Sequence, residues 1–575
     1  MELEFQNYPK FTPEMKKTHK ILIPNMAPVQ FRILAAVMRQ AGYTCELLEN
    51  CGSQVSELGL KYVHNDTCYP ALLVIGQFLD ALGSGKYDLD HTALIITQTG
   101  GGCRASNYIH LLRKALVKAG YGQVPVVSLN FSGLEKDSGF PMTLPLMRKL
   151  LACIYYGDLL VALKAQTEPY ETHKGDAAAL QEKWLDTICG WVMEDKGWSG
   201  REIKAAMPKI AAEFAAIPVH RVPKVKVGVV GEIYVKYSPL GNNDLEKFLA
   251  SQDCEVNLPG LMGFVQYCVA NMAETVRLYG GSKLLELGSD TLMSWLTVRE
   301  KLMIAAIKKH PQFHAPTLFL DTKKMADGII GIGNKMGEGW LLTAEMMELQ
   351  QTGFENIICA QPFGCLPNHI CGKGMINKIR ELYPQANITP IDYDPSATRV
   401  NQENRIKLML AVARERLAEV DEKYAAVDRE ARRLDHAGAA PSPALDALLA
   451  DRGEPPCPHG ARLGDLLRRP RVSYDDLAPF DAERPALSRE ITRQVEISVK
   501  YQGYIDRQNR QVEEMKKLEG RPLPPNMDYQ SIQGLRLEAR QKLSQIRPLN
   551  LGQASRISGV SPADLTALMI YLERG

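Results

Sequence analysis

Short apolar runs alternate with amphipathic segments from the start of the chain. Residues 20–26 (KILIPNM) predict a buried strand, and residues 28–42 predict a helix with Pro28 in its first turn and Gly42 at its end. The same alternation predicts further strands and helices at 45–49, 68–85, 92–99, 107–120, 125–130, 225–232, 244–252, 356–364, 374–384 and 387–394. Strands that alternate with helices in this way are typical of parallel βαβ units.

One long stretch interrupts the alternation, because residues 144–217 are mostly helical in pattern. This stretch separates two similar α/β regions. The predicted fold class is therefore α/β, with two Rossmann-like parallel-sheet lobes, a helical linker between them, and an all-α C-terminal domain. The predicted domains are residues 1–165, 166–222, 223–415 and 416–575.

A change of composition marks the start of the C-terminal region. No lysine occurs between Lys423 and Lys500, although arginine is abundant there. Residues 437–460 are rich in Pro, Ala and Gly, and this predicts a loop or hinge between helices. A second unit is therefore expected to begin around residues 410–425.

Composition and charge exclude few classes of protein. The 575 residues are 45% hydrophobic and 23% charged, with a formal net charge of +2. These values are ordinary for a globular protein and argue neither for nor against nucleic-acid binding. No apolar run reaches the ~18–20 residues that span a bilayer, and the N-terminus has no apolar signal core. We therefore expect a cytoplasmic protein without membrane partners.

Three of the twelve cysteines share one structural setting. Cys103 and Cys365 each follow a predicted strand and precede a helix, and Cys68 opens a helix after a polar turn. In an open parallel sheet, residues at the carboxyl ends of the strands converge on one crevice. Helix N-termini in that crevice stabilise negative charge, and the neighbouring glycines allow close backbone approach. The pattern predicts that Cys68, Cys103 and Cys365 are cofactor-binding and metal-binding residues, with an iron–sulfur cluster as the preferred ligand.

Zinc is the main alternative for these thiols. Structural zinc usually takes paired Cys-x₂₋₄-Cys ligands, and the chain has no such pair. Cys359 lies inside an apolar strand, and most other cysteines occupy periodic apolar segments that predict core positions. Cys457 and His459 form an isolated pair that gives only a weak metal signal.

The segments around the three cysteines resemble a known family. KYVHNDTCYPALLVIGQFLDAL, ALIITQTGGGCRASNYIHLLRKAL, GNKMGEGWLLTAEM and QPFGCLPNHICGKGMINKIRELYP are similar to the 2-hydroxyacyl-CoA dehydratase superfamily. They resemble most the dehydratase-like half of the acyl-CoA dehydratase activase-related proteins. The resemblance covers roughly residues 10–415. It implies a [4Fe-4S] cluster on Cys68, Cys103 and Cys365, an ATP-dependent activator as electron donor, and a lyase that removes water from an acyl-CoA substrate.

One feature of the large relatives has no counterpart in the motifs of this sequence. Those relatives carry an ATPase half upstream of the dehydratase-like half. The nearest phosphate-loop pattern here, GSGKYD at 83–88, lacks the first glycine and the Ser or Thr after lysine. The activator is therefore expected to be a separate partner.

The C-terminal region resembles a different family. VSYDDLAPF, EISVKYQGYIDRQNRQVEEMKKLE and IRPLNLGQASRISGVSPADLTALMIYLERG are similar to the C-terminal helical domain of the flavin-dependent tRNA wobble-uridine modification enzyme, the MnmG or GidA family. The resemblance runs from roughly Arg414 to Gly575 and departs from the family at Arg536, where a serine is usual. It implies binding of tRNA and of a partner GTPase. Because no G-x-G-x-x-G motif follows a strand, no FAD and no independent tRNA modification are expected.

Basic residues of this region are the candidates for contact with tRNA phosphates. They are Lys500, Arg507, Arg510, Arg547 and Arg556. The alternative interpretation is that these charges only form a solvated surface.

Three functional hypotheses follow from the two resemblances. The first is an iron–sulfur acyl-CoA dehydratase or reductase with a tRNA-modification domain fused to it. The second is a tRNA- and partner-GTPase-binding protein of the uridine-modification family that lacks the FAD domain. The third is a cluster-bearing electron-transfer scaffold.

Overall fold

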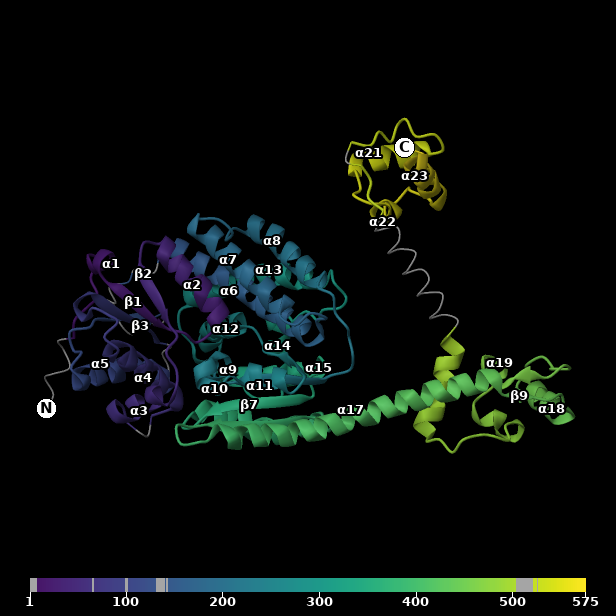
Figure 1. Cartoon of the computed structure of the whole chain (residues 1–575), viewed down its shortest axis with the longest axis horizontal. Helices are drawn as coiled ribbons and strands as arrows, with labels where there is room; N and C mark the ends of the chain where they lie inside the picture. Colours follow the sequence, from purple (N-terminus) through teal and green to yellow (C-terminus); the bar gives the residue numbers. More distant parts are fainter. Residues whose placement is uncertain are drawn as a thin grey trace. The chain divides into compact units, whose positions relative to one another are not determined.

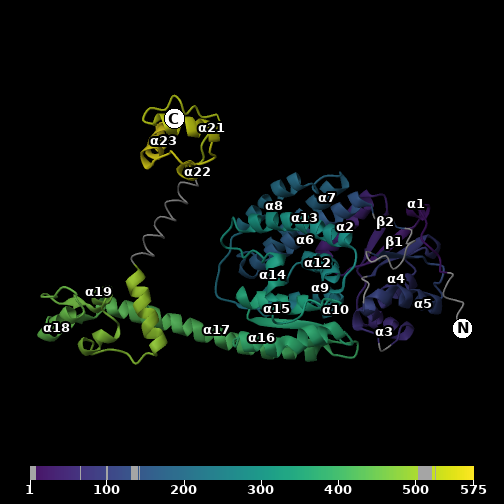
Figure 2. The ribbon, with the colours of Figure 1, turned by 180° about the vertical axis from the view of Figure 1, so that it is seen from behind.

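The computed structural model of the chain describes residues 8–64, 67–98, 102–130, 140, 143–502, 521–524 and 526–574. The chain divides into two compact units, which we call unit 1 (Met1–Leu417) and unit 2 (Ala418–Gly575). Figure 1 colours the chain along its sequence, and Figure 2 shows it from behind. One long helix, α17 (Arg399–His436), contains the boundary between the units.

The first sheet of unit 1 has four parallel strands in the order β2-β1-β3-β4. The strands are β1 (Lys20–Pro24), β2 (Thr44–Leu48), β3 (Thr92–Gln98) and β4 (Val126–Asn130), and the flanking helices are α2 (Pro28–Gln40), α4 (Tyr69–Gly83) and α5 (Tyr108–Ala119). Successive side chains of a strand point to opposite faces of the sheet. Ile21 therefore shares a core with α2, whereas its neighbour Leu22 shares a core with α4 and α5. Burial on both faces explains why these strands are continuous apolar runs.

The second sheet repeats this plan with the strand order β6-β5-β7-β8, again all parallel. The strands are β5 (Val225–Gly231), β6 (Cys254–Asn257), β7 (Asn356–Pro362) and β8 (Asn387–Tyr393), and nearby helices are α9 (Ile233–Tyr237), α10 (Pro239–Asn242), α11 (Leu245–Ser251), α15 (Trp340–Gln351) and α16 (Ile376–Leu382). Ile358 and Leu94 belong to one core, so the two sheets share buried apolar contacts.

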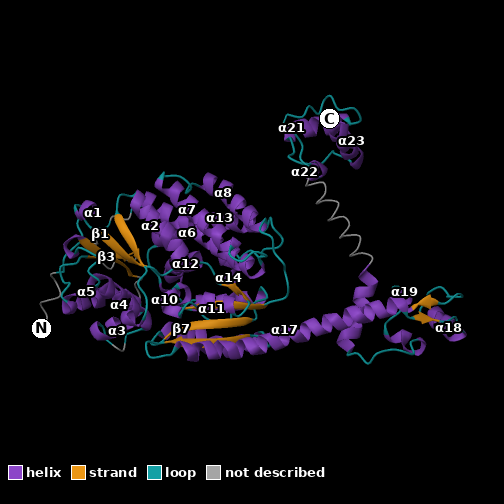
Figure 3. Cartoon of the chain, viewed as in Figure 1, coloured by secondary structure: helices purple, strands orange, loops and turns teal. Residues whose placement is uncertain are grey.

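A layer of helices completes unit 1, as Figure 3 shows. It contains α6 (Leu144–Thr167), α7 (Asp176–Met193), α8 (Gly200–Ala215), α12 (Leu261–Tyr279), α13 (Lys283–Ile307) and α14 (Phe319–Met325). The largest core of the molecule includes Tyr155, Leu296 and Trp340, which are almost fully buried. None of the helices in the described part of the chain combines the length and the apolar character that a membrane span requires.

One close helix pair positions Cys68 at the start of α4. α3 (Ser53–Tyr62) packs on α4 through Gly59 and Gly76. A Cβ on Gly76 would lie 1.9 Å from Val55 O, so any larger residue would push the two backbones apart. The remaining helix of unit 1 is α1 (Met15–Thr18).

Unit 2 contains two separate hydrophobic cores. The first includes Leu434, Leu466 and Val495, and its elements are α18 (Pro443–Asp451), α19 (Leu463–Leu467) and the antiparallel pair β9 (Gly438–Ala439) and β10 (Ala461–Arg462). The second includes Leu543 and Leu568, and its elements are α21 (Leu537–Ile546), α22 (Leu551–Ser555) and α23 (Pro562–Arg574).

The coarse prediction of the fold is confirmed, because parallel α/β sheets precede a helical C-terminal region. The finer description as two Rossmann-like lobes, and the division into four domains, stay predictions. The expected loop at 437–460 differs from the structure, which places α18 there. Ser442 caps this helix by accepting a hydrogen bond from Leu445 N at 3.2 Å, and Pro443 occupies the first turn.

Candidate functional site

The structure brings the segments of the three predicted cysteines together at the carboxyl ends of the two sheets. Cys68 is the N-cap of α4, Cys103 precedes a 3₁₀ turn (Arg104–Asn107), and Cys365 precedes a π-helical turn (Asn368–Gly372). Tyr69 N donates a hydrogen bond to Phe363 O at 3.3 Å, and this joins the Cys68 segment to the Cys365 segment.

The Cys103 segment meets the segment that precedes α15. A Cβ on Gly337 would lie 3.9 Å from Cys103 Sγ and 3.2 Å from Pro367 Cγ. Gly102 N donates to Met336 Sδ at 3.0 Å. Gly337 has a φ of +59°, in the region that favours glycine, so this close approach depends on the absence of a side chain.

The surroundings of these thiols favour their neutral form. Burial raises the pKa of Cys103 to about 12, and the carboxylates of Glu338 and Glu232 add to the shift. Burial followed by the same two carboxylates also raises the pKa of Cys365. Burial raises the pKa of Cys68 even though its Sγ lies 2.8 Å from Tyr108 Oη.

Two glutamates that the sequence analysis missed face this cysteine group. Glu232 Oε2 accepts a hydrogen bond from Val235 N at 2.9 Å, and Glu338 Oε1 accepts one from Ile233 N at 2.9 Å. Burial, followed by repulsion from Glu338, raises the pKa of Glu232 to about 8. Glu232 stands directly after β5, so the strand-end argument that selected the cysteines could also have selected it.

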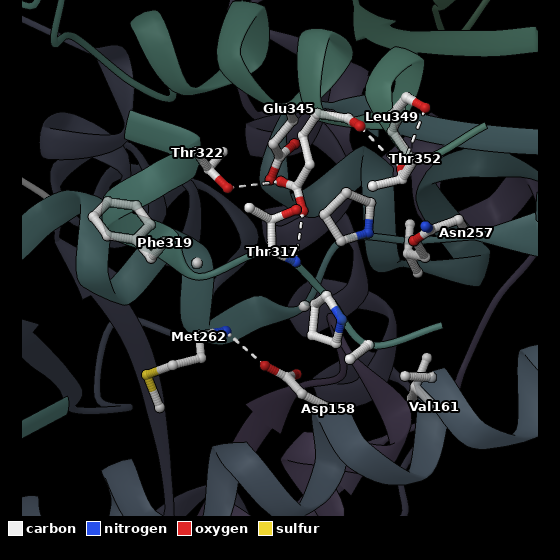
Figure 4. A pocket seen from close by; sticks show the side chains of 18 of the residues that line it. Asp158, Val161, Asn257, Met262, Thr317, Phe319, Thr322, Glu345, Leu349 and Thr352 are labelled. Carbon is white, nitrogen blue, oxygen red and sulfur yellow. Dashed lines mark hydrogen bonds between the residues drawn. The ribbon is translucent and has the colours of Figure 1, made fainter. Parts of the chain in front are cut away.

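A separate cavity of about 130 Å³ lies among α6, α12, α15 and residues 313–322 of unit 1 (Figure 4). Asp158 lines it and accepts hydrogen bonds from Leu261 N at 3.0 Å and Met262 N at 2.8 Å. Glu348 accepts from Thr317 N at 3.1 Å and Thr322 Oγ1 at 2.9 Å. These carboxylates therefore hold the start of α12 and the chain before α14.

Glu345, which also lines this cavity, belongs to a buried ion pair. Lys236 Nζ donates to both carboxylate oxygens of Glu345 at 2.9 Å, and each side chain is 5% exposed. Burial raises the pKa values of Asp158 and Glu348, because neither has a cation as a direct partner. The acidic residues of the cavity are thus engaged in holding the fold.

The predicted RNA-binding residues lie beside the two cores of unit 2. Lys500 Nζ donates to Pro470 O at 3.2 Å and pairs with Glu496 at 2.8 Å, next to the first core. Arg547 ends α21 in the left-handed conformation, with φ +47°, and Arg556 ends α22; both are exposed. Arg507 and Arg510 lie outside the described residues.

Arg536, where the sequence departs from the resembled family, has a structural partner. Its guanidinium donates to Asp564 at 2.7 Å (Nη2) and 3.0 Å (Nε). Asp564 is fully buried and also accepts from Arg536 N and from Ser561. The pair ties the start of α21 to the start of α23.

Two family models match the C-terminal region of the chain. The model described as tRNA modifying enzyme MnmG/GidA C-terminal helical domain matches residues 414–509. The model described as tRNA modifying enzyme MnmG/GidA C-terminal helical bundle matches residues 511–575. The C-terminal resemblance found in the sequence is therefore confirmed.

The proteins that this chain resembles are also named MnmG or GidA. A tRNA uridine 5-carboxymethylaminomethyl modification enzyme MnmG from Caldicellulosiruptor saccharolyticus is 45% identical over 163 residues, which are 28% of this chain and 26% of that protein. The MnmG of Latilactobacillus sakei subsp. sakei is 35% identical over 260 residues, 44% of this chain and 41% of that protein. A structure of Aquifex aeolicus GidA is 28% identical, with a TM-score of 0.20, and covers 30% of this chain and 27% of that one. The chain thus spans 26% of the length of the first of these relatives.

These matches correct the cofactor prediction. A [4Fe-4S] cluster without FAD is contradicted, because the relatives are named as tRNA uridine modification enzymes and not as iron–sulfur proteins. Across the described residues, no three or more His, Cys, Asp or Glu side chains are grouped so that they could hold a metal ion. Burial is the largest of the effects that raise the pKa values of the Cys103 and Cys365 thiols. Neither the dehydratase resemblance nor its activator and acyl-CoA partners gain support from the comparisons.

Proposed function

We propose that this chain is a tRNA- and partner-GTPase-binding protein of tRNA uridine modification, in which residues 414–575 supply the contact with tRNA. The main support is the 45% identity over 163 residues with an enzyme named for tRNA uridine modification. The two family models cover the same region almost without a gap, at 414–509 and 511–575. Because the chain spans 26% of that relative, the proposal concerns binding and not the complete modification reaction.

The proposed contacts are electrostatic. Lys500, Arg547 and Arg556, together with Arg507, would pair with backbone phosphates. Arg547 and Arg556 are exposed and stand at helix ends, where a phosphate can approach them. Pairing with a phosphate releases counterions, so the slope of log affinity against log salt should change by ~0.7–0.9 for each basic residue that is removed from the interface.

The test is tRNA binding by the full chain across a salt series. We expect Arg547→Ala/Arg556→Ala to reduce the salt slope by ~1.4–1.8. The matched control is Lys308→Ala/Lys309→Ala, which removes two exposed charges from the end of α13 in unit 1 and should leave the slope unchanged. Binding that does not depend on salt, or a slope that the arginine variant leaves unaltered, would contradict the proposal.

The GTPase contact needs a test of its own. The full chain and the tRNA-modification GTPase of the same organism should elute together from a size-exclusion column in the presence of GTP. Separate elution in both the GTP-bound and GDP-bound states would remove this partner from the proposal without affecting the tRNA contact.

We also propose that Cys68, Cys103 and Cys365 belong to one small-molecule site of unit 1. The specific support is the contact between the Cys68 and Cys365 segments, with Glu232 and Glu338 beside the thiols. An acyl-CoA is the ligand class that the dehydratase resemblance implies. Calorimetry with acetyl-CoA should show saturable binding that Cys365→Ser weakens and that Cys189→Ser, in the linker helices, leaves unchanged. Absence of heat with the wild-type chain would end this assignment.

A further inference from the structure

Arg299 lies where α13 packs against α6 and α8 in unit 1, and only 9% of its surface is exposed. Its Nη1 donates to Trp295 O at 3.1 Å, and its guanidinium carbon lies 3.3 Å from the centre of the Trp295 ring. Nε is buried and has no hydrogen-bond partner among the described residues. No carboxylate in the described ranges pairs with this guanidinium, which makes it a buried cation without a counter-ion.

Burying an unpaired cation destabilises the folded state unless an anion binds next to it. Burial, and then repulsion from Arg148, lower the pKa of Arg299 below its usual range. The other buried cation of unit 1, Lys236, has a full carboxylate partner in Glu345. A desolvated charge normally requires such a partner. The contrast indicates that the partner of Arg299 comes from outside the chain.

A second cation and a helix start face the same place. Arg148 on α6 is exposed, and no ion pair with it exists within the ranges that the structure describes. α8 begins at Gly200, and its capping box uses only the N–H groups of Ser199 and Glu202. The N–H groups of Gly200 and Arg201 keep no partner in the described structure, and they lie at the positive end of the helix dipole.

The first turn of α8 lies directly beside the guanidinium. A Cβ placed on Gly200 would have a single heavy atom within 4 Å, Arg299 Nη2 at 3.9 Å. The nearby acids are engaged elsewhere, because Asp195 pairs with Lys149 at 2.5 Å and Glu202 completes the capping box. Donors and positive charge therefore meet at this point without a free carboxylate among the described residues.

We propose that Arg299, Arg148 and the first turn of α8 form a binding site for the phosphate group of a small molecule. Two guanidinium groups and a helix N-terminus match the charge and the acceptor oxygens of a phosphate. A carboxylate carries one charge and would leave part of the positive charge unbalanced. Because Arg299 is nine-tenths buried, the backbone of a folded RNA cannot reach it, so the site is distinct from the tRNA contact proposed for unit 2.

The experiment measures binding of inorganic phosphate to the full chain by calorimetry and by the thermal midpoint of tryptophan fluorescence. All five tryptophans lie in unit 1, and Trp295 stacks on Arg299, so this signal reports on the site. Phosphate should raise the midpoint above that in chloride of equal ionic strength, since a ligand that binds only the folded state stabilises it. Acetate should bind at least about tenfold more weakly than phosphate.

Variants test each part of the site. Arg148→Gln changes an exposed residue that should not affect folding, and it should weaken phosphate binding about tenfold. Arg299→Lys keeps the charge but loses the planar fork, so it should also weaken binding. The control Lys209→Gln removes an exposed charge from the third turn of α8 and should bind as wild type does.

The sources of the phosphate are distinguished by comparing inorganic phosphate, AMP and adenosine. Tighter binding of AMP than of phosphate, with none of adenosine, identifies a phosphate ester as the ligand, and the reverse order identifies the free ion. The proposal is overturned if wild type shows no saturable response to either anion. It is overturned equally if Arg148→Gln responds as wild type does, or if tRNA competes with phosphate for the site.

Discussion

Buried charges are paired in unit 2, whereas unit 1 contains both a buried pair, Lys236 with Glu345, and charges without a partner among the described residues. In unit 2, Asp564 is fully buried and pairs with Arg536, and Glu430 and Asp481 both pair with Arg433. In unit 1, Glu348 is half-buried and Arg299 is buried, and neither has a partner of opposite charge in the described structure. A paired buried charge is compensated within the folded structure. An unpaired buried charge is unfavourable until a ligand of opposite charge binds or the group changes its protonation state. The charges without a partner make unit 1 the candidate region for ligand chemistry, beside its own structural pair of Lys236 and Glu345.

The largest effect is expected where a buried pair in unit 2 is broken. Burial alone would raise the pKa of Asp564, but hydrogen bonds from Arg536 and Ser561 outweigh it and hold the pKa well below its usual range. Asp564→Ala should destabilise the second core of unit 2 by about 3 kcal/mol, because it leaves these donors without an acceptor. Hydrogen exchange of the peptides over 530–570 measures this loss of stability. The control is Glu538→Ala, which changes an exposed residue of α21, a helix of the same core.

The pH dependence of this pair has a definite sign. Because the folded pKa of Asp564 is depressed, its stabilisation is present above the unfolded pKa of about 4 and is lost as pH falls below it. Protection of 530–570 should therefore fall below about pH 4 in wild type and change less in Asp564→Ala. Equal pH profiles in the two proteins would show that the pair does not stabilise the unit.

At Glu348 in unit 1 we expect a smaller pH dependence of folding stability, with the opposite sign. Burial raises the pKa of Glu348, so the folded state binds its proton more tightly than the unfolded state does. Stability from this group is present below the unfolded pKa of about 4.3 and declines as pH rises through the folded pKa. Glu348→Gln should remove this decline, so the stability of the variant relative to wild type should rise with pH.

The geometry of Glu348 makes glutamine a suitable replacement. The amide oxygen can accept from Thr317 N, and the amide nitrogen can donate to the Thr322 hydroxyl, which rotates to accept. Tryptophan fluorescence follows the thermal midpoint, since every tryptophan is in unit 1. If the midpoint of Glu348→Gln relative to wild type does not rise with pH, the contrast between the units would fail at this position.

The same contrast explains which parts of the molecule could be predicted from the sequence. β1 and β3 coincide with the apolar runs at 20–26 and 92–99, because strands buried on both faces need no alternating polar positions. β6 was missed because it has four residues, and one of them, Glu255, is a buried charge whose partner is Tyr170. A four-residue segment that contains a glutamate has a residue pattern typical of a loop, so the sequence does not predict a strand there.

The features of the candidate sites also fall into those that the local sequence predicts and those that depend on distant residues. Strand-end positions are local features, so the approach of the Cys68 and Cys365 segments could be inferred from sequence. Whether a charge has a partner depends on residues elsewhere in the chain, since Arg536 meets Asp564 whereas Arg299 meets the like charge of Arg148. The cluster prediction considered the thiols alone, because their burial and the carboxyls near them depend on how distant segments pack.

The smallest effect on stability should come from a surface charge of unit 2. Lys500 pairs with Glu496 at 2.8 Å across one helical turn, with side chains 20% and 28% exposed. Helical pairs with this i,i+4 spacing contribute about 0.3–0.5 kcal/mol, so Lys500→Ala should change the unfolding free energy by about that amount. If Lys500 contacts a tRNA phosphate, the same substitution should still lower the salt slope of tRNA binding by ~0.7–0.9. Lys423→Ala, which breaks the comparable pair with Glu490, is the matched control and should leave the slope unchanged. A loss of stability above about 1 kcal/mol would show that Lys500 is a structural charge of unit 2. An unchanged salt slope would lead to the same conclusion. Normal stability with a reduced slope would instead mark it as a charge kept for a partner, as the unpaired charges of unit 1 are.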